Sequence, residues 1–330
     1  MAAHSGAKLA AYHLILFSLM KVLLTTTSFQ DTPGKHQELL NKQDFEVDSL
    51  RGPLTEEQLL PIIDQYDALI CGDDDLTAPV LEKGKKGRLK YISKYGVGLD
   101  RIDLVKAKEL GIPVTNCPGV NQVSVSEHVF ALLFSFCKNI HLEYNVTKAG
   151  GWKRYVNREI FGKTIGIVGL GAIGAEVAKR GAAFGLNVIG YDPYAKPEIA
   201  EKYDVKMQET FKDLAAQSDI ITLHVPHTPQ TEKLINLDLV ENTLKPGVII
   251  INTARGKLID IDAVKLGLEK KIIAGYLADV LDIEPMPENY AMKDWDNVLI
   301  TPHIGSRTYE SVERQGSAAV ENLIKMINNH

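Results

Sequence analysis

The sequence predicts an α/β protein with two doubly wound parallel-sheet domains and a cleft between them. The chain has 330 residues, which is too long for one ordinary compact domain. From Met20 onward, short apolar segments rich in β-branched residues alternate with helix-like segments. This alternation is typical of parallel sheets with helices on both faces.

Composition and charge narrow the classes of function. Apolar residues make up 45% of the chain and charged residues 24%, the ordinary balance of a soluble globular protein. The net charge of −5 offers no basic surplus for a nucleic acid, and the lysines between residues 83 and 90 are explained by a solvated helix end. The 3 cysteines form no CxxC pair, which argues against disulfides and zinc and fits a reducing, cytoplasmic location.

An apolar run over 9–20 precedes the first predicted strand. It is too short to cross a bilayer, so we expect no membrane partner. A signal-peptide core is the alternative, but no small-x-small cleavage site follows. Because Lys21–Thr25 itself reads as a strand, we expect residues 1–19 to be an upstream or artificial extension outside the fold.

The first part of the chain contains short apolar strands joined by helices. One helix is predicted from Thr55, whose hydroxyl can cap its amino end, to about Tyr66. Another is predicted over 103–110, with Gly111 as its stop. The strands are expected at 22–27, 68–71, 89–93 and 112–115.

Pro118-Gly119 marks a break, after which Asn121 is expected to cap one long helix over 122–148. Its apolar residues cover more than one stripe, and such a helix is buried on several sides. It therefore either bridges domains or packs against another subunit. A second α/β run follows over 163–301, and one more amphipathic helix follows Ser306.

A glycine-rich turn connects a buried-type strand at 164–168 to a helix. Strand, GxGxxG and helix together form the context of a dinucleotide site. Gly169 permits the tight turn, Gly171 lets the backbone approach a pyrophosphate, and Gly174 allows close packing of helix on strand. The amino end of the helix then attracts phosphates.

Asp192 follows the next predicted strand, where a carboxylate can accept hydrogen bonds from a ribose diol. The same carboxylate would repel a 2′-phosphate, so NAD is favoured over NADP. A glycine-rich turn beside an unrelated acidic loop residue is the structural alternative, but it does not explain why strand, turn, helix and acid occur together.

Three later strand-like segments each end in a loop with an ionisable residue, where parallel strands form ligand crevices. These loops contain Arg255, the pair Asp279 and Glu284, and His303. Reduction of a 2-keto acid needs a cationic anchor, a proton donor and a hydride source. An arginine matches a carboxylate, a histidine titrates near working pH, and a neighbouring carboxylate orients the histidine and raises its pKa.

Taken together, these motifs resemble the D-isomer-specific 2-hydroxyacid dehydrogenases over about residues 20–328. Among them, the short phosphoglycerate dehydrogenase-like and hydroxypyruvate or glyoxylate reductase-like members are the most similar. The resemblance rests on Lys94–Asp100 (KYGVGLD), the glycine turn with Asp192, Asn252–Gly256 (NTARG), Asp279–Pro285 and Thr301–Gly305 (TPHIG).

The resemblance implies two Rossmann-like domains and NAD as the cofactor. The outer, substrate-binding domain would comprise residues 20–118 plus 306–330, around an NAD-binding domain of residues 119–305. A homodimer through the helix at 122–148 is also implied.

The resemblance further implies roles for individual residues. His303 would be the acid/base, Glu284 its partner, and Arg255 the group that binds and polarises the keto acid. The substrate would also meet Lys94 and the backbone of Tyr95, Gly96, Val97 and Gly98. Cofactor contacts are implied for Gly169, Gly171, Ala172, Ile173, Gly174, Asp192, Val225, Pro226, Thr231, Thr253, Ala254, Arg255, Asp279, His303 and Gly305.

Several residues have a purely structural alternative. Arg255 could be a surface arginine, Glu284-Pro285 only a turn, and His303 a buried histidine satisfied by the backbone. Lys94 could meet a second anionic group on the substrate or be an ordinary surface lysine.

For the other polar candidates we prefer the structural explanation. Asp73-Asp74-Asp75 is better explained by capping and solvation than by a metal site, and no metal is expected. His128 and His141, on the long helix, are expected to serve packing or an interface.

The substrate and even the activity stay open at this level. Glyoxylate, hydroxypyruvate, a branched keto acid and phosphohydroxypyruvate are all compatible with the motifs. An NAD(H)-sensing scaffold, as in the related co-repressors, is the alternative to an enzyme.

Overall fold

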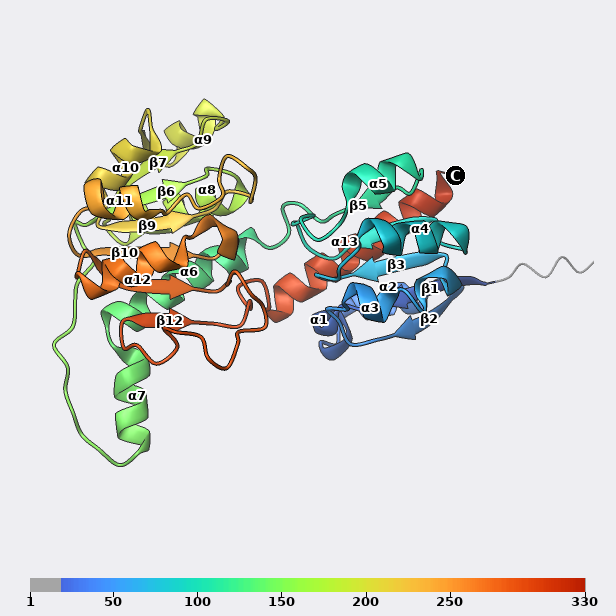
Figure 1. Ribbon diagram of the computed structural model, residues 1–330, viewed down its shortest axis with the longest axis horizontal. Coiled ribbons are helices and arrows are strands. Elements are labelled where there is room, and N and C mark those ends of the chain that lie inside the picture. Colours follow the sequence, from blue (N-terminus) through green and yellow to red (C-terminus); the bar gives the residue numbers. More distant parts are fainter. Residues whose placement is uncertain (1–18, 330) are drawn as a thin grey trace, which may run out of the picture.

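A computed structural model describes residues 19–329 of the chain. Apart from Leu19, the expected extension over 1–19 lies outside the described residues. The described part forms two lobes, each built on a parallel sheet (Figure 1). The predicted pair of parallel-sheet α/β domains is therefore confirmed.

The first lobe has a five-stranded sheet in the order β2-β1-β3-β4-β5. Its strands are β1 (Met20–Leu24), β2 (Phe45–Ser49), β3 (Ala68–Cys71), β4 (Tyr91–Lys94) and β5 (Val114–Thr115). Its helices are α1 (Thr27–Asp31), α2 (Lys35–Asn41), α3 (Glu56–Leu59), η1 (Ile63–Gln65), α4 (Ala78–Lys86) and α5 (Leu104–Glu109).

The last helix, α13 (Tyr309–Asn328), returns from the second lobe and packs against α2 and β4. Ala319, Val320 and Leu323 of this helix share a buried cluster with Val22 and Leu24 of β1. The carboxyl-terminal helix therefore completes the core of the first lobe. The residues proposed as domain boundaries, 118/119 and 305/306, stay a prediction.

The second lobe has a seven-stranded sheet in the order β12-β11-β10-β9-β6-β7-β8. Its strands are β6 (Thr164–Val168), β7 (Asn187–Tyr191), β8 (Lys206–Met207), β9 (Ile220–Leu223), β10 (Val248–Asn252), β11 (Ile273–Ala278) and β12 (Val298–Ile300). The helices around it are α6 (Gln122–Cys137), α8 (Ala172–Ala183), α9 (Pro197–Lys202), α10 (Phe211–Gln217), α11 (Leu237–Asn242), η2 (Gly256–Leu258) and α12 (Ile261–Glu269).

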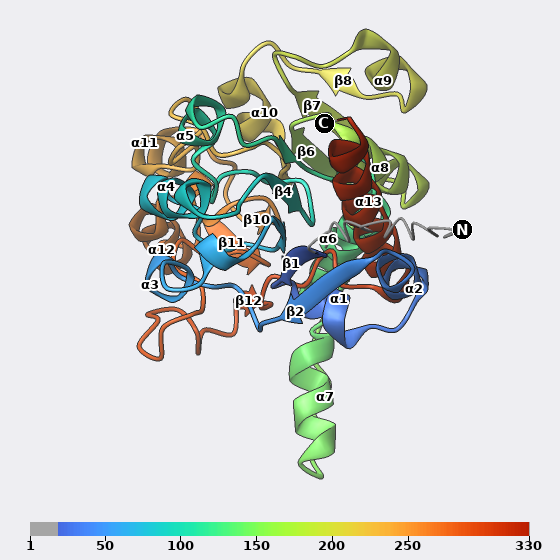
Figure 2. The same cartoon turned by 90° about the vertical axis from the view of Figure 1, so that its right-hand side faces the viewer.

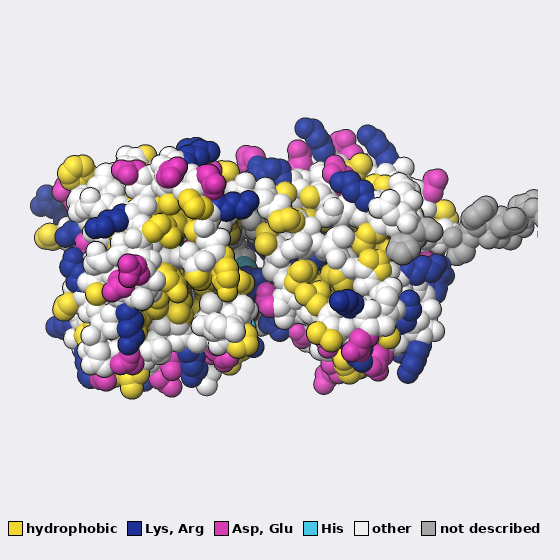
Figure 3. Space-filling view, turned by 90° about the horizontal axis from the view of Figure 1, so that it is seen from above, with side chains coloured by type: hydrophobic (Ala, Val, Ile, Leu, Met, Phe, Trp, Pro, Cys, Tyr) yellow, Lys and Arg dark blue, Asp and Glu magenta, His cyan; other side chains and the backbone are white. Residues whose placement is uncertain are grey.

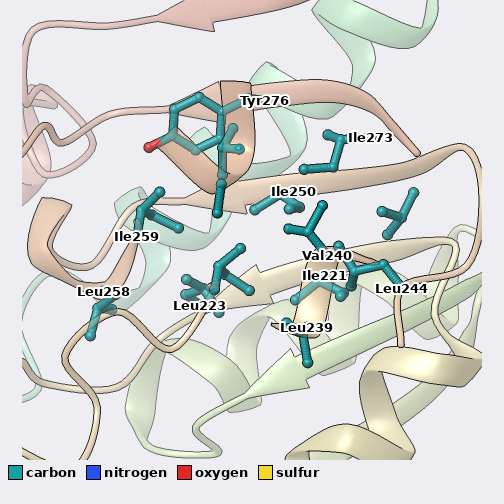
Figure 4. Close-up of a cluster of buried hydrophobic side chains, with 14 of the residues drawn as sticks. Ile221, Leu223, Leu239, Val240, Leu244, Ile250, Leu258, Ile259, Ile273 and Tyr276 are labelled. Atoms are coloured by element: carbon teal, nitrogen blue, oxygen red, sulfur yellow. The ribbon is translucent and has the colours of Figure 1, made fainter. Parts of the chain in front are cut away.

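The central strands of this sheet are buried on both faces, which explains their continuous apolar sequences. On one face, Ile221 and Ile250 pack with Leu239 and Val240 of α11 (Figure 4). Each such side chain contributes about 1.5–3 kcal/mol by leaving water. The strands therefore form a rigid platform for the loops at their carboxyl ends.

The prediction of one helix over 122–148 is wrong. The helix α6 ends at Cys137, and a separate helix, α7 (Ile140–Lys148), follows. Asn139 between them has φ of 47°, the left-handed conformation that asparagine tolerates better than most residues. No residue of α7 is buried, and the helix projects away from the second lobe (Figures 1 and 2).

The helix α6 itself fits the expectation of burial on several sides. It packs against α8, β10 and β11, with Val129 and Leu133 fully buried. Asn121 stands at its amino end, but the asparagine side chain makes no capping hydrogen bond. The predicted cap is therefore wrong, although the start of the helix is correct.

The predicted helix from Thr55 to Tyr66 is also wrong in its length. The helix α3 ends at Leu59 and a short 3₁₀ turn follows, because Pro61 has no N–H to donate and its ring clashes with the preceding turn. By contrast, the helix predicted over 103–110 is present as α5, and Asp103 caps it by accepting a hydrogen bond from the Lys106 amide at 2.9 Å.

The three cysteines are buried free thiols. Burial raises the pKa of the Cys71 thiol to about 12, so this residue serves packing rather than chemistry. Across residues 19–329, no helix combines the length and the apolar character that crossing a bilayer requires.

Candidate active site

A cavity of about 1420 Å³ lies between the two lobes, at the carboxyl ends of strands from both sheets. It occupies the waist of the molecule that Figure 3 shows from above. Most of the residues selected from the sequence line it: Lys94, Tyr95, Gly96, Val97, Gly98, Ile173, Val225, Pro226, Thr253, Ala254, Arg255, Asp279, Glu284, His303 and Gly305.

The glycine turn between β6 and α8 has the geometry that a pyrophosphate requires. Gly169 has φ of 94°, and a Cβ on Gly174 would lie 2.0 Å from the Gly169 carbonyl oxygen. These two positions therefore exclude any side chain. A Cβ on Gly171 would meet no atom within 4 Å, so the outer face of the turn is open at the amino end of α8, whose first residues are Ala172 and Ile173.

Asp192 stands beside this turn. Its Oδ2 accepts a hydrogen bond from the Leu170 amide at 2.8 Å, and its Oδ1 accepts one from the Tyr194 amide at 2.8 Å. These bonds orient the carboxylate next to the turn, where its negative charge disfavours a 2′-phosphate.

Two threonines expected to contact the cofactor behave differently. The Thr253 hydroxyl is buried in the cavity wall and has no hydrogen-bond partner among the described residues. A bound ligand would satisfy such a group. The Thr231 hydroxyl donates to the Pro226 carbonyl at 2.7 Å and accepts from the Thr228 amide at 2.8 Å. Thr231 is outside the cavity lining, so it shapes the loop that places Pro226.

His303 and Glu284 form an ion pair in the cavity. The Nδ1 of His303 lies 2.8 Å from Oε2 of Glu284, whose Oε1 accepts a hydrogen bond from the Leu281 amide at 2.8 Å. Burial works against the charged imidazole, but the Glu284 hydrogen bond and the charges of Asp73 and Glu284 outweigh it. The pKa of His303 is therefore raised above its ordinary 6.5. The alternatives of a mere turn and a backbone-satisfied histidine do not explain this contact.

Asp279 anchors the loop that carries His303. Its buried carboxylate accepts hydrogen bonds from the Thr301 hydroxyl at 2.6 Å, the Ile304 amide at 2.9 Å and the Gly305 amide at 2.7 Å. Burial opposes its ionisation, but these donors and His128 keep the pKa of Asp279 below its ordinary value. The carboxylate is therefore held by the protein itself.

His128, which was expected to serve packing or an interface, lies outside the cavity lining but contacts the residues that hold the His303 loop. Its Nε2 lies 2.9 Å from the Thr301 hydroxyl and 3.3 Å from the Asp279 carboxylate. The histidine belongs to α6, and only the packing of α6 against β11 brings it there. No local signal in the sequence could have indicated this contact.

Arg255 reaches across the cavity to the first lobe. Its Nε and Nη2 lie 2.9 and 2.8 Å from Oδ1 of Asp100, and its Nη1 donates to the Ala254 carbonyl at 2.7 Å. A Cβ on Gly98 would lie 1.6 Å from Nη2, so glycine is needed for this position of the guanidinium. The alternative of a surface arginine is therefore wrong.

The loop after β4 was expected to present its amides to the substrate. The Tyr95 amide donates to the Cys71 carbonyl at 2.8 Å, as part of the ladder between β3 and β4. The prediction is therefore wrong for Tyr95, because an amide that donates to the Cys71 carbonyl cannot also donate to the substrate. Gly96, Val97 and Gly98 lie beyond the ladder and line the cavity.

Lys94 is not an ordinary surface lysine. Its side chain is 3% exposed, and its Nζ donates to the Gly72 carbonyl at 2.5 Å and to Oδ1 of Asp73 at 2.7 Å. Asp73 also lines the cavity, which the interpretation as a capping residue missed.

The neighbouring acids, Asp74 and Asp75, have other partners. Asp74 is buried, and its carboxylate accepts from the Thr25 hydroxyl and the Leu54 amide, both at 2.6 Å. Asp75 pairs with Arg101 at 2.9 Å. The three adjacent acids therefore serve three different purposes.

Comparisons with known proteins agree with this arrangement. Residues 130–305 match the family model described as D-isomer specific 2-hydroxyacid dehydrogenase, NAD binding domain. The chain is 41% identical over 300 residues to a hydroxypyruvate reductase of Thermotoga maritima, covering 88% of this chain and 93% of the relative. It is 38% identical over 312 residues to a D-3-phosphoglycerate dehydrogenase of Methanocaldococcus jannaschii, covering 94% of this chain but only 58% of the relative.

A solved structure of a protein from Thermus thermophilus superposes with a TM-score of 0.84 at 34% identity. The match covers 94% of this chain and 98% of the other. The similarity therefore extends over both lobes.

Proposed function

The chain belongs to the family of NAD-dependent D-isomer-specific 2-hydroxyacid dehydrogenases, and from this premise we propose that it interconverts a small D-2-hydroxy acid and its 2-keto acid. The observation that carries the proposal is the meeting of Arg255, Glu284 and His303, from three separate loops, in one cavity near a glycine turn open to a pyrophosphate.

In the reductive direction, NADH supplies a hydride to the carbonyl carbon when it is bound. His303 donates its proton to the carbonyl oxygen, and Glu284 stabilises the imidazolium before the transfer. Together, the hydride and the proton convert the keto group to an alcohol. In the oxidative direction, neutral His303 accepts the hydroxyl proton.

Arg255 and the loop after β4 position the acid. The guanidinium can bind the substrate carboxylate and the carbonyl oxygen, because its planar donors fit both. The Asp100 contact keeps the guanidinium oriented before the substrate arrives. The loop of Gly96, Val97 and Gly98 lines the cavity, and we propose that its amides complete the carboxylate site.

A screen with four 2-keto acids tests the activity. We expect NADH oxidation with at least one of glyoxylate, hydroxypyruvate, a branched keto acid and phosphohydroxypyruvate, followed at 340 nm. NADPH should be the poorer cofactor, because Asp192 repels its 2′-phosphate. Tight NADH binding without turnover of any of the four would instead favour the sensing scaffold.

We also propose that the protein is a homodimer, with α7 and the segment after it as the interface. Large apolar side chains gather there in exposed positions: Tyr144, Trp152 and Val156 are 59, 85 and 98% exposed, and Ile140 and Phe161 are exposed as well. So many large exposed apolar side chains in one segment are typical of a protein interface.

Trp152→Ser combined with Val156→Asp should convert the dimer to a monomer in light scattering after size exclusion. Tyr194→Ser is the matched control, because Tyr194 is 92% exposed but lies next to Asp192, outside the segment proposed as the interface. A monomeric wild-type chain, or a dimer unaffected by the double substitution, would contradict the proposed interface.

A further inference from the structure

The wall that the first lobe contributes to the cavity contains a carboxylate beside a buried lysine. Lys94 at the end of β4 and Asp73 after β3 face each other, because the two strands are neighbours in the sheet and Cys71 is paired with Lys94. The lysine side chain is 3% exposed, whereas that of Asp73 is 50% exposed and lines the cavity. The group that meets the substrate here is therefore the acid.

The ammonium of Lys94 is already engaged. Two of its three donors bind the Gly72 carbonyl and Oδ1 of Asp73, at 2.5 and 2.7 Å. Within residues 19–329, no hydrogen bond is found to Oδ2 of Asp73, so this oxygen can accept one from a ligand. The nearby cations keep the acid ionised: burial opposes its charge, but Lys94, His303 and Arg255 lower the pKa of Asp73.

The cations at the reacting end of the cavity are also paired. Arg255 is matched by Asp100 and His303 by Glu284, as Lys94 is by Asp73. A phosphate group beside Asp73 would meet its carboxylate, and the adjacent Lys94 ammonium is already engaged. Unfavourable charge contacts of this kind exclude one ligand while another is accepted.

A neutral polar group lies close to the pair. The Thr26 hydroxyl lines the cavity, is buried, and has no hydrogen-bond partner among the described residues. A Cβ on Gly72 would lie 3.7 Å from this hydroxyl, which places it next to the backbone that Lys94 contacts. The wall therefore presents the Asp73 carboxylate and the Thr26 hydroxyl to a substituent of the substrate.

We propose that Asp73 is a specificity-determining residue: it admits 2-keto acids whose third carbon carries a hydrogen-bond donor, such as a hydroxyl or an ammonium group, and rejects those that carry a phosphate. The inference deepens the proposed function and rests on it. It removes the option, open from the sequence, that Lys94 receives a second anionic group of the substrate.

The test compares substrates that differ only at the third carbon. For the wild type and Asp73→Asn, kcat/KM is measured with hydroxypyruvate and phosphohydroxypyruvate, and each value is divided by that for glyoxylate, which has no third carbon. In the wild type we expect the hydroxypyruvate ratio to exceed the phosphohydroxypyruvate ratio. In Asp73→Asn the phosphohydroxypyruvate ratio should rise by about tenfold or more, a change of roughly 1.4 kcal/mol, and the hydroxypyruvate ratio should fall.

Asp44→Asn is the matched control, since it removes the same charge from an exposed residue of the first lobe that does not line the cavity. Both ratios should keep their wild-type values in this variant. Asp73→Ser, which also removes the charge, is the second variant in case Asp73→Asn does not fold, as judged by circular dichroism.

The outcomes separate the two proposals. No NADH oxidation with any of these acids overturns the proposed function and this inference together. Glyoxylate reduction with unchanged ratios in the Asp73 variants overturns the inference alone. A wild-type enzyme that prefers phosphohydroxypyruvate to hydroxypyruvate overturns it as well.

Discussion

Replacement of His303 by asparagine is expected to lower kcat by about 10²–10⁴-fold in both directions, the usual contribution of a positioned acid/base. Asparagine is preferred to alanine because His303 has φ of 53°, and asparagine adopts this left-handed conformation more readily than most residues. The loop should therefore keep its shape while losing the titratable group. Steady-state kinetics at saturating NADH measures the effect.

The same substitution should leave NADH binding largely intact. The glycine turn and Asp192 lie on β6, α8 and β7, and no hydrogen bond of the described residues joins them to the His303 side chain. A fluorescence titration with NADH provides the control. Normal turnover in His303→Asn would remove the proposed acid/base.

The pH dependence follows from the raised pKa of His303. Reduction needs the protonated imidazole, so kcat/KM for the keto acid should be highest at low pH and fall as the pH rises through the His303 pKa, which lies above 6.5. Oxidation should show the opposite dependence. In Glu284→Gln the hydrogen bond to a negative charge is lost, so the reductive decline should move to lower pH.

Local sequence patterns were sufficient where the structure depends on neighbouring residues. The strand at 68–71 has the bounds predicted for it, because four apolar residues between Asp67 and Gly72 define a buried parallel strand. The glycine turn was also predictable, since Gly169 and Gly174 occupy positions of this turn where a side chain does not fit. The strand β2 was missed, because its alternating acidic residues at 46 and 48 do not read as buried.

Contacts between distant segments were beyond the reach of these patterns. The helix break at Asn139 contains neither glycine nor proline, so the sequence pattern predicted one continuous helix across it. The positions of Lys94 and Asp73 depend on which strands are neighbours in the sheet, and the place of His128 depends on how α6 crosses the second sheet. A family resemblance identified Arg255, Glu284 and His303 and implied the pairing of the last two, but it did not indicate the contact of Arg255 with Asp100.

Gly98→Ala is expected to lower kcat/KM by about 10²-fold, although no functional group is removed. Gly98 does not have a positive φ, so alanine fits the backbone, but the added Cβ would overlap Nη2 of Arg255 at 1.6 Å and approach Oδ1 of Asp100 at 2.8 Å. The guanidinium must move, and a displacement of about 1 Å in a positioning group can cost about 10²-fold in rate. Kinetics with the preferred keto acid measures the loss, with NADH affinity as the control.

Comparison with Arg255→Lys shows whether the two residues act through the same contact. Lysine keeps the charge but loses the planar donors, so it should cause a loss of similar size. If Gly98 acts only by leaving room for the guanidinium, Gly98→Ala combined with Arg255→Lys should be little worse than either single variant. Both changes disrupt the same contact, so the second change has little further effect. Additive losses would mean that Gly98 serves the substrate directly, and wild-type kinetics in Gly98→Ala would mean that Arg255 does not bind the acid from this position.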